Sequence, residues 1–151
     1  MRIGVVSDTH GLLRPEVLLR LEGVAHILHA GDVGDISILH RLAEIAPVTA
    51  IRGNVDVTGP TAALSATDMV EIGGVTIYLV HSVHDLDIKP EAAGVQVVVS
   101  GHSHKASLDE RNGVMFLNPG SIGPRRFRLP VSMAMLRIEG SAVHAELVTL
   151  D

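Results

Sequence analysis

Three short hydrophobic runs mark the first third of the chain, and two stretches with a helical spacing of apolar residues separate them. The runs cover residues 2–6, 25–29 and 48–51, which is a typical length for buried strands. Strands that alternate with helices in this order predict a largely parallel sheet joined by right-handed crossovers.

Two helices are expected between these runs. Pro15 fits the first turn of the first helix, because the N–H that proline lacks would have no partner there. Asp35 or Ser37 could cap the second helix, which ends at Pro47. The apolar positions that we expect to be buried are Val17, Leu18 and Leu21 in the first helix and Ile38, Leu39, Leu42 and Ile45 in the second.

The second half of the chain has mainly hairpin patterns. The expected hairpins pair residues 68–72 with 75–80, residues 106–109 with 114–117, and residues 132–138 with 143–149. Their turns lie at Gly73-Gly74, Arg111-Asn112-Gly113 and Gly140-Ser141. Residues 86–93 are predicted to form a short helix before a buried strand at 95–99. Together the elements predict an α/β (α+β) fold of two packed mixed β-sheets, with helices over one outer face.

Length and composition narrow the range of functions. A chain of 151 residues should form one domain over residues 1–151, and its 2% of aromatic residues requires a core of Val, Leu, Ile and Ala. The absence of cysteine excludes disulfides, thiolate zinc sites and cysteine nucleophiles. A net charge of −5 gives no support for a large nucleic-acid-binding surface, although Arg125-Arg126-Phe127-Arg128 is basic. No stretch has the pattern of a signal peptide or a membrane span, so we expect a cytoplasmic protein without membrane contact.

Polar residues of metal-binding types follow five of the hydrophobic runs. They are Asp8, His10, Asp32, Asn54, His81, His102 and His104. The carboxyl ends of strands in α/β sheets are where ligands bind, so we expect these side chains to converge. Carboxylate, amide and imidazole ligands without thiolate suit hard or borderline divalent metals.

Seven ligands are too many for one structural zinc ion, which takes four. They suit two metal ions, typically about 3.5–4 Å apart, which can activate water for an in-line displacement at phosphorus. The set offers only two carboxylates, so the loaded site stays net positive and favours an anionic substrate such as a phosphate ester.

The ordered motifs resemble those of the calcineurin-like metallophosphoesterases. These motifs are Asp8-Thr9-His10, Gly31-Asp32, Gly53-Asn54, His81 and Gly101-His102-Ser103-His104. Asn54-Val55-Asp56 and Asn118-Pro119-Gly120-Ser121, with the short length, are similar to the small bacterial YfcE-type phosphodiesterases. The resemblance implies a β-sandwich flanked by helices, a four-layer αββα fold.

Roles for the ligands follow from the resemblance, position by position. It implies that Asp8, His10 and His104 hold one metal ion, and that Asn54, His81 and His102 hold the other. Asp32 would bridge the two ions, with a bridging water or hydroxide as the nucleophile. We expect two divalent ions, with Mn²⁺ as the first choice and Fe, Zn²⁺ or Ni²⁺ as alternatives.

The chain departs from the wider family at two positions. Many members carry a His after the Asn as general acid, and here that position is Val55. Many also have Gly and soon a second His after the position of His81, whereas here the chain continues Ser82-Val83-His84. Asp56 and His84 are therefore the candidate catalytic proton donors.

Three further features carry open alternatives. Asn54 and Arg125 are the candidate substrate-binding residues, although Arg125 would also fit a solvated basic loop. His29 could orient a ligand from the second shell or simply pack at a strand end. Asn118-Pro119-Gly120-Ser121 could position phosphate through backbone N–H groups, or only form a turn.

The sequence thus predicts a metal-dependent phosphoesterase, and most specifically a phosphodiesterase that acts on a small phosphate ester. A phosphomonoesterase is one alternative. A scaffold or binding protein of the same fold, like one subunit of the eukaryotic retromer, is another, and hydrolysis of a non-phosphate bond is a third. Exposed hairpins are compatible with a homodimer.

Overall fold

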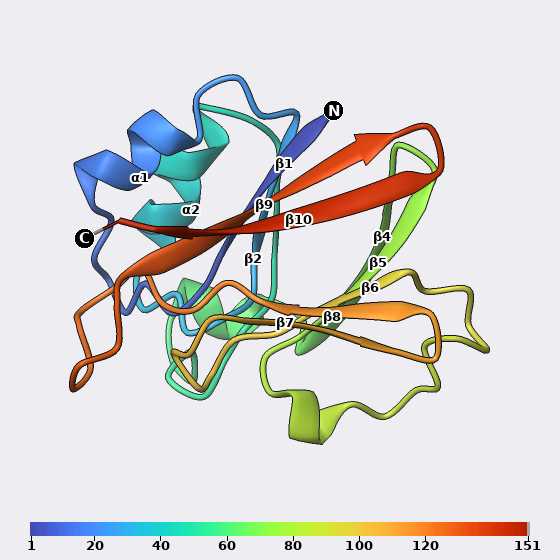
Figure 1. Cartoon of the computed structure of the whole chain (residues 1–151). Coiled ribbons are helices and arrows are strands. Elements are labelled where there is room, and N and C mark those ends of the chain that lie inside the picture. The colour runs from blue at the N-terminus through green and yellow to red at the C-terminus, as the bar shows by residue number, and fades with distance from the viewer. Residues whose placement is uncertain (151) are drawn as a thin grey trace.

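Two five-stranded β-sheets pack face to face in the computed structural model, which describes residues 1–150 (Figure 1). The first sheet has the strand order β10-β9-β1-β2-β3. Its members are β1 (Arg2–Val6), β2 (His26–His29), β3 (Val48–Ala50), β9 (Ser132–Glu139) and β10 (Ala142–Thr149). Strands β1, β2 and β3 pair in parallel, whereas β9 pairs antiparallel with both β1 and β10, so the sheet is mixed. The predicted β-α-β-α-β unit is therefore present.

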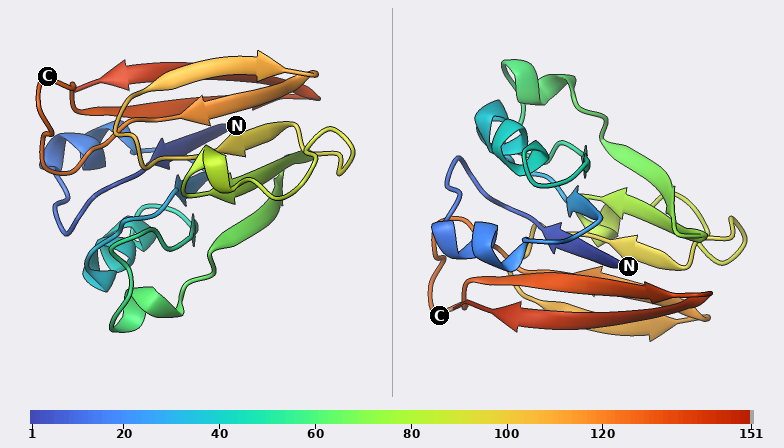
Figure 2. Two further views of the ribbon diagram at one scale, coloured as in Figure 1. Left: turned by 90° about the horizontal axis from the view of Figure 1, so that it is seen from below. Right: turned by 90° about the horizontal axis from the view of Figure 1, so that it is seen from above.

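The second sheet has the order β4-β5-β6-β8-β7 and is also mixed. Its members are β4 (Thr67–Ile72), β5 (Val75–Val80), β6 (Val97–Val99), β7 (Ser107–Arg111) and β8 (Val114–Asn118). Its three central strands are parallel, and an antiparallel strand lies at each edge. The three predicted hairpins all form, with boundaries within two residues of those expected. The β10 edge of the first sheet runs beside the β7 edge of the second (Figure 2).

The main core lies between the two sheets. It consists of branched aliphatic side chains and alanine, including Ile3, Val5 and Leu28 from the first sheet and Ile77, Leu79 and Val97 from the second. Alternate residues of a strand face opposite sides, so Val6 and Ile27 point away from this core and pack under the helices. Two buried faces explain why the central strands are hydrophobic throughout.

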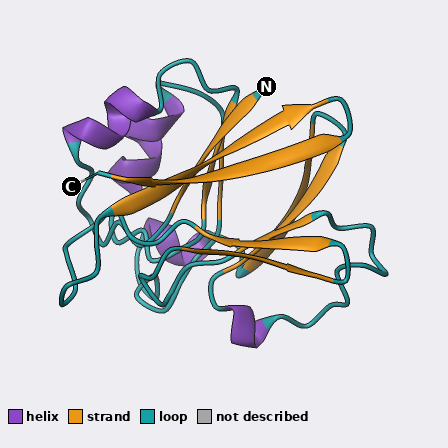
Figure 3. Cartoon of the chain, in the orientation of Figure 1, coloured by secondary structure: helices purple, strands orange, loops and turns teal. Residues whose placement is uncertain are grey.

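Helices α1 (Pro15–Arg20) and α2 (Ile36–Ala43) cover the outer face of the first sheet, on one side of the molecule (Figure 3). Asp35 caps α2 by accepting a hydrogen bond from the Ser37 N–H at 2.9 Å. The buried positions include Val17, Leu21, Ile38, Leu39 and Leu42 as predicted, while Leu18 and Ile45 are only partly buried.

The helix predicted over residues 86–93 is wrong. The chain forms the 3₁₀ helices η1 (Pro60–Ala63) and η2 (Val83–Asp85), and residues 86–93 form bends and turns. Pro90 has no N–H to donate and disfavours a helical conformation at Lys89, which prevents a regular helix here. Leu86 and Ile88 still cover Tyr78 and Val98 on the outer face of the second sheet.

The predicted fold class is confirmed: two mixed sheets form a sandwich with α-helices on one side. The fourth layer consists of η2 and its neighbouring turns. No helix within residues 1–150 is both long enough and apolar enough to cross a membrane.

His29 joins the loops that follow β1 and β2. It is fully buried, and its Nδ1 accepts a hydrogen bond from the Gly31 N–H at 3.1 Å. The Thr9 hydroxyl donates to the Val33 carbonyl at 2.8 Å, so it accepts from His29 Nε2–H at 3.0 Å. Both ring nitrogens are thereby satisfied in the neutral tautomer, and burial lowers the pKa of His29 to about 4.

This buried histidine should make stability fall in acid. An unfolded His29 takes up a proton near pH 6.5, whereas the folded one does so only near pH 4, so acid favours the unfolded state. Urea unfolding of the EDTA-treated protein should show that the free energy of unfolding falls by about 2 kcal/mol between pH 8 and pH 5 because of this group. His29→Gln should remove that part of the slope, and His144→Gln, on exposed β10, should not. Equal slopes in wild type and His29→Gln would contradict the account.

Candidate metal centre

The carboxyl ends of β1, β2, β3, β5 and β6 meet at one edge of the sandwich, where the predicted ligands lie. Parallel strands end at the same side of a sheet, so each delivers its following loop to the same place. The side chains of Asp8, His10, Asp32, His81 and His104 converge there.

Asp8 follows β1, is completely buried and has two differently used oxygens. Its Oδ2 accepts hydrogen bonds from the Ser7 hydroxyl at 2.6 Å and from the His102 N–H at 3.1 Å. Its Oδ1 has no hydrogen-bond donor. The Nε2 atoms nearest to Oδ1 belong to His104, His10 and His81, at 3.4, 3.8 and 3.9 Å. A buried oxygen without a donor needs another positive partner.

Asp32 follows β2, and, as in Asp8, one of its carboxylate oxygens is hydrogen-bonded to the protein while the other faces imidazole nitrogens. Oδ1 accepts a hydrogen bond from the Val55 N–H at 3.0 Å. Oδ2 lies 3.2 Å from His81 Nε2 and 3.6 Å from His10 Nε2. Asp32 therefore contacts histidines of both predicted half-sites, which is the position expected of a bridging ligand.

His81 is buried directly after β5, and the main chain fixes the direction of its ring. Its Nδ1 lies 2.7 Å from the Ala30 carbonyl oxygen and donates to it. Nε2 is thereby aimed at the carboxylates, where it has no hydrogen-bond partner. A ligand histidine held through its second nitrogen by a carbonyl is a common arrangement in metal sites.

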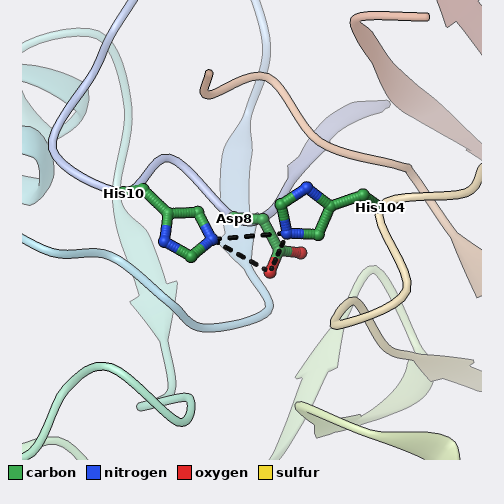
Figure 4. Close-up of side chains that lie close together, drawn as sticks. All are labelled: Asp8, His10 and His104. Atoms are coloured by element: carbon green, nitrogen blue, oxygen red, sulfur yellow. Dashed lines mark hydrogen bonds and ion pairs between the residues drawn. The ribbon is translucent and has the colours of Figure 1, made fainter. Parts of the chain in front are cut away.

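His10 and His104 complete a group with Asp8. Their Nε2 atoms are 3.3 Å apart, and both face the same carboxylate oxygen (Figure 4). The ligand atoms of this group lie within 4.8 Å of one another, as do those of Asp8, Asp32 and His81. Oxygen and neutral imidazole donors with buried, unpartnered atoms fit divalent metal ions. The residues present therefore fit a divalent metal site.

His102 and Asn54 lie on the solvent side of this group. The His102 ring is exposed, and its centroid is 5.2 Å from that of His81, nearly perpendicular to it. Asn54 is also exposed and lines a cleft together with His81. Both residues border His81, as expected if the three share a metal ion, but they are less enclosed than the other five.

Strained backbone is concentrated at the predicted ligands. Seven non-glycine residues within 1–150 have a positive φ, and five of them are Asp8, His10, Asp32, His102 and His104, with φ between 47° and 71°. Side-chain-bearing residues seldom adopt this conformation, and it persists where the surrounding structure enforces it for function. The turns aim successive side chains inward, which is how Asp8 and His10 reach the same point.

Glycines next to the ligands make room for them. A Cβ on Gly31 would lie 2.6 Å from His81 Nδ1, and one on Gly101 would lie 2.6 Å from Asp8 Oδ2. A Cβ on Gly53 would meet the Asp32 carboxylate. The Gly-Asp, Gly-Asn and Gly-His motifs therefore reflect close approach of the main chain to a neighbouring ligand.

Burial and charge set different protonation states for the ligands. Burial favours the neutral acid at Asp32, but neighbouring His81 and the Val55 N–H outweigh it and hold the pKa of Asp32 well below its usual value. Burial also opposes charge on His81, yet Asp32 and the Ala30 carbonyl raise its pKa overall. Burial, with nearby Arg126, lowers the pKa of His104 to about 4. The lowered pKa favours the neutral, ligating form of His104, whereas the raised pKa of His81 makes its proton harder to remove.

The structure contradicts the predicted proton-donor role of Asp56. Its side chain is buried, and Oδ2 accepts hydrogen bonds from the N–H groups of Val33 at 3.1 Å and Gly53 at 2.9 Å. Oδ1 accepts from the Gly34 N–H at 3.0 Å. Both oxygens serve the main chain and neither faces the metal ligands. Asp56 instead ties the loop after β2 to the loop after β3.

Two clefts flank the ligands. The His102-side cleft has a volume of about 480 Å³ and is lined by residues including Ser82, His84, His102, Leu108 and Phe116. The Asn54-side cleft has a volume of about 370 Å³, and its lining includes Arg52, Asn54, His81 and Asp87.

The other two predicted site residues, His84 and Arg125, are exposed and lie outside the group of buried ligands. His84 is exposed in η2, on the wall of the His102-side cleft, which keeps it available as a proton donor. Arg125 is exposed in the loop before β9 and lines neither cleft. Its neighbour Arg126 acts electrostatically on His104.

Ser7 is a supporting residue that the sequence did not indicate, whereas Asn118 and Ser121 lie in a segment that it did single out. Ser7 fixes Asp8, and the Asn118 side chain donates to the Gly101 carbonyl at 2.9 Å and to the Ser103 hydroxyl at 3.1 Å. Ser121 donates to the Asp8 carbonyl at 2.9 Å. The Asn118-Pro119-Gly120-Ser121 segment is therefore a turn that braces the ligand loops.

Comparisons with known proteins agree with this geometry. The model of the calcineurin-like phosphoesterase superfamily domain matches residues 1–141. A probable metallophosphoesterase of Methanothermobacter thermautotrophicus is 33% identical over 98% of this chain and 92% of its own length. A phosphodiesterase of Methanocaldococcus jannaschii is 27% identical over 80% of this chain and 83% of its own length.

Solved structures share the fold. Vps29 of Chaetomium thermophilum superposes with a TM-score of 0.79 at 20% identity, covering 99% of this chain and 96% of its own. An archaeal phosphodiesterase superposes with a TM-score of 0.78 at 22% identity, covering 98% of this chain and 100% of its own. From the match of the family model and the identity to the Methanothermobacter relative, the chain belongs to the calcineurin-like phosphoesterase superfamily.

Proposed function

We propose that this protein is a phosphodiesterase that uses two divalent metal ions, with Mn²⁺ as the expected metal. Asp8, His10 and His104 would hold one ion, and Asn54, His81 and His102 the other, with Asp32 shared between them. Two ions bound in this way would activate a water molecule and offset the charge that develops on the phosphoryl oxygens. The protein would work as a small, independent hydrolase of the cytoplasm.

The proposal depends on the two carboxylates, each of which has one oxygen hydrogen-bonded to the protein and the other facing imidazole nitrogens. Asp8 and Asp32 each spend one oxygen on protein donors and turn the other toward imidazole nitrogens 3.2–3.9 Å away. An arrangement meant only for stability would pair both oxygens with N–H or O–H groups. Asp8 Oδ1 and His81 Nε2 are both buried without a hydrogen-bond partner, and this pair leaves room and charge for a cation.

The two clefts support a diester rather than a monoester. A phosphodiester carries two organic groups, and two clefts border the predicted ligands, one lined by His102 and the other by Asn54 and His81. A phosphomonoester would use only one of them. The relative from Methanocaldococcus jannaschii, named a phosphodiesterase, is consistent with this preference.

His84 is the remaining candidate for protonating the leaving oxygen. Val55 has no titratable group at the position of the family's general acid, and Asp56 is committed to backbone N–H groups. His84 is exposed on the wall of the His102-side cleft, where an ester oxygen could reach it.

Loss of a ligand should abolish turnover while leaving the fold intact. With Mn²⁺ and bis-p-nitrophenyl phosphate, Asp32→Asn should lower kcat/KM by more than the roughly 100-fold typical of losing an outer-shell partner. Its amide oxygen can still accept from the Val55 N–H, so thermal unfolding should change little. His102→Ala should also lose activity. Asp68→Asn, on exposed β4, and His144→Ala are matched controls.

Unchanged turnover in both ligand variants would refute the proposal. Lack of turnover in the wild type, together with no bound metal by elemental analysis, would instead favour the scaffold alternative. Turnover of p-nitrophenyl phosphate but not of its diester would favour a phosphomonoesterase.

Metal binding should strengthen as pH rises, because His81 has to give up a proton. Asp32 and the Ala30 carbonyl raise the pKa of His81, so protons compete with metal to a higher pH than for a free imidazole. Calorimetric titration with Mn²⁺ at pH 6.5 and pH 8 should show tighter binding at pH 8 and proton release at pH 6.5. Equal affinity at both pH values with no proton release would contradict this assignment.

General-acid catalysis by His84 should depend on the leaving group. His84→Ala should slow hydrolysis of a diester with a poor leaving group by about 100-fold or more, the lower range for a positioned acid. It should hardly change hydrolysis of bis-p-nitrophenyl phosphate, because p-nitrophenolate leaves without a proton. Equal effects on both substrates would show that His84 acts otherwise.

A further inference from the structure

The lining of the His102-side cleft is chemically distinct from that of its neighbour. One wall is apolar and is formed by Val83, Leu108 and Phe116. The Asn54-side cleft contains charged Arg52, Asp85 and Asp87 at its wall. The two organic groups of a diester would therefore meet different surroundings.

The charged residues of the His102-side cleft neutralise each other. Arg111 Nε lies 3.1 Å from Asp109 Oδ2, and the Arg111 guanidinium lies 4.8 Å above the Phe116 ring. Both charged side chains line the cleft, and their pairing with each other leaves neither of them free for a second phosphate or an ammonium group. The Arg111–Phe116 contact instead provides a flat wall of the kind on which planar groups stack.

Hydrogen-bonding groups in this cleft are available to a ligand. The hydroxyls of Ser82 and Ser107 line it and have no hydrogen-bond partner among residues 1–150. The volume of about 480 Å³ falls in the range of small-molecule pockets, roughly 300–1,000 Å³. An uncharged, planar group with polar edges fits this combination of apolar wall, paired charges and free hydroxyls.

We propose that the His102-side cleft binds a nucleoside as the leaving group of a phosphodiester substrate. The inference rests on the proposed function and names the substrate class of the same site. Water forms a new P–O bond, the bond from phosphorus to the nucleoside oxygen breaks, and that oxygen leaves with a proton supplied by His84. The attacking water loses one proton, which restores His84. The products are a neutral nucleoside and a phosphate monoester.

The test uses thymidine 5′-(methyl phosphate), whose two ester bonds give different products. The wild-type protein with Mn²⁺ should release thymidine and methyl phosphate, rather than methanol and thymidine monophosphate, as followed by chromatography. Leu108→Arg places a large charge at an exposed position in the apolar wall, so folding should be unaffected. It should lower the ratio of thymidine to methanol by at least tenfold. Leu147→Arg, an exposed leucine on β10, is the control and should keep the wild-type ratio.

The outcomes separate this inference from the proposed function. If the wild type hydrolyses neither bis-p-nitrophenyl phosphate nor the thymidine ester, the phosphodiesterase proposal itself fails. If it hydrolyses bis-p-nitrophenyl phosphate but leaves the thymidine ester intact, or releases methanol from it, the nucleoside assignment is overturned. The assignment is also overturned if Leu108→Arg and Leu147→Arg give the same product ratio.

Discussion

The structure depends on how two buried carboxylates at one edge of the sandwich find positively charged partners. Asp8 and Asp32 are both buried, and each keeps one oxygen anchored by the main chain or a hydroxyl. The remaining oxygens face imidazole nitrogens, and Asp8 Oδ1 has no hydrogen-bond donor. A buried carboxylate costs free energy unless a positive partner compensates it. Burial opposes charge on His81, but Asp32, the Ala30 carbonyl and Asp8 together raise its pKa.

The same constraint explains the unusual backbone around the site. Five ligands adopt a positive φ, and three glycines permit close packing against their neighbours. Strain of this kind needs a rigid surrounding to maintain it. Two packed sheets supply that rigidity, and hydrogen bonds from His29, Asp56 and Asn118 tie the ligand loops to one another. The polar residues that hold the loops are thus as buried as the hydrophobic core, and they form part of the same folded unit.

The sequence predicted the strands well because two buried faces make each central strand continuously hydrophobic, and glycine-containing turns mark the hairpins. It also predicted that the polar residues after these strands converge, and five of the seven do so, since each follows a strand whose direction is fixed by the sheet pairing. The role of Asp56 was not predicted because two of its three N–H partners, Val33 and Gly34, lie more than 20 residues away, and no local pattern reveals them. The helix predicted at residues 86–93 does not form because Pro90 has no N–H for a helical hydrogen bond. The apolar residues of this segment cover the sheet without forming a helix.

Under the proposed function, the edge strand β7 would contribute to specificity without contributing a metal ligand. The ligands come from loops after the parallel central strands, where strain, glycines and buried hydrogen bonds leave little freedom for change. The walls of the His102-side cleft come from η2, from residues 100–103 after β6 and from the β7–β8 hairpin, whose strand β7 is exposed along its whole length. Substitutions at Leu108 or Asp109 would alter the surface offered to a leaving group without moving a metal ligand. A protein of this design can keep one catalytic centre and change its substrate through an edge strand alone, because edge positions tolerate changes that the ligand loops do not.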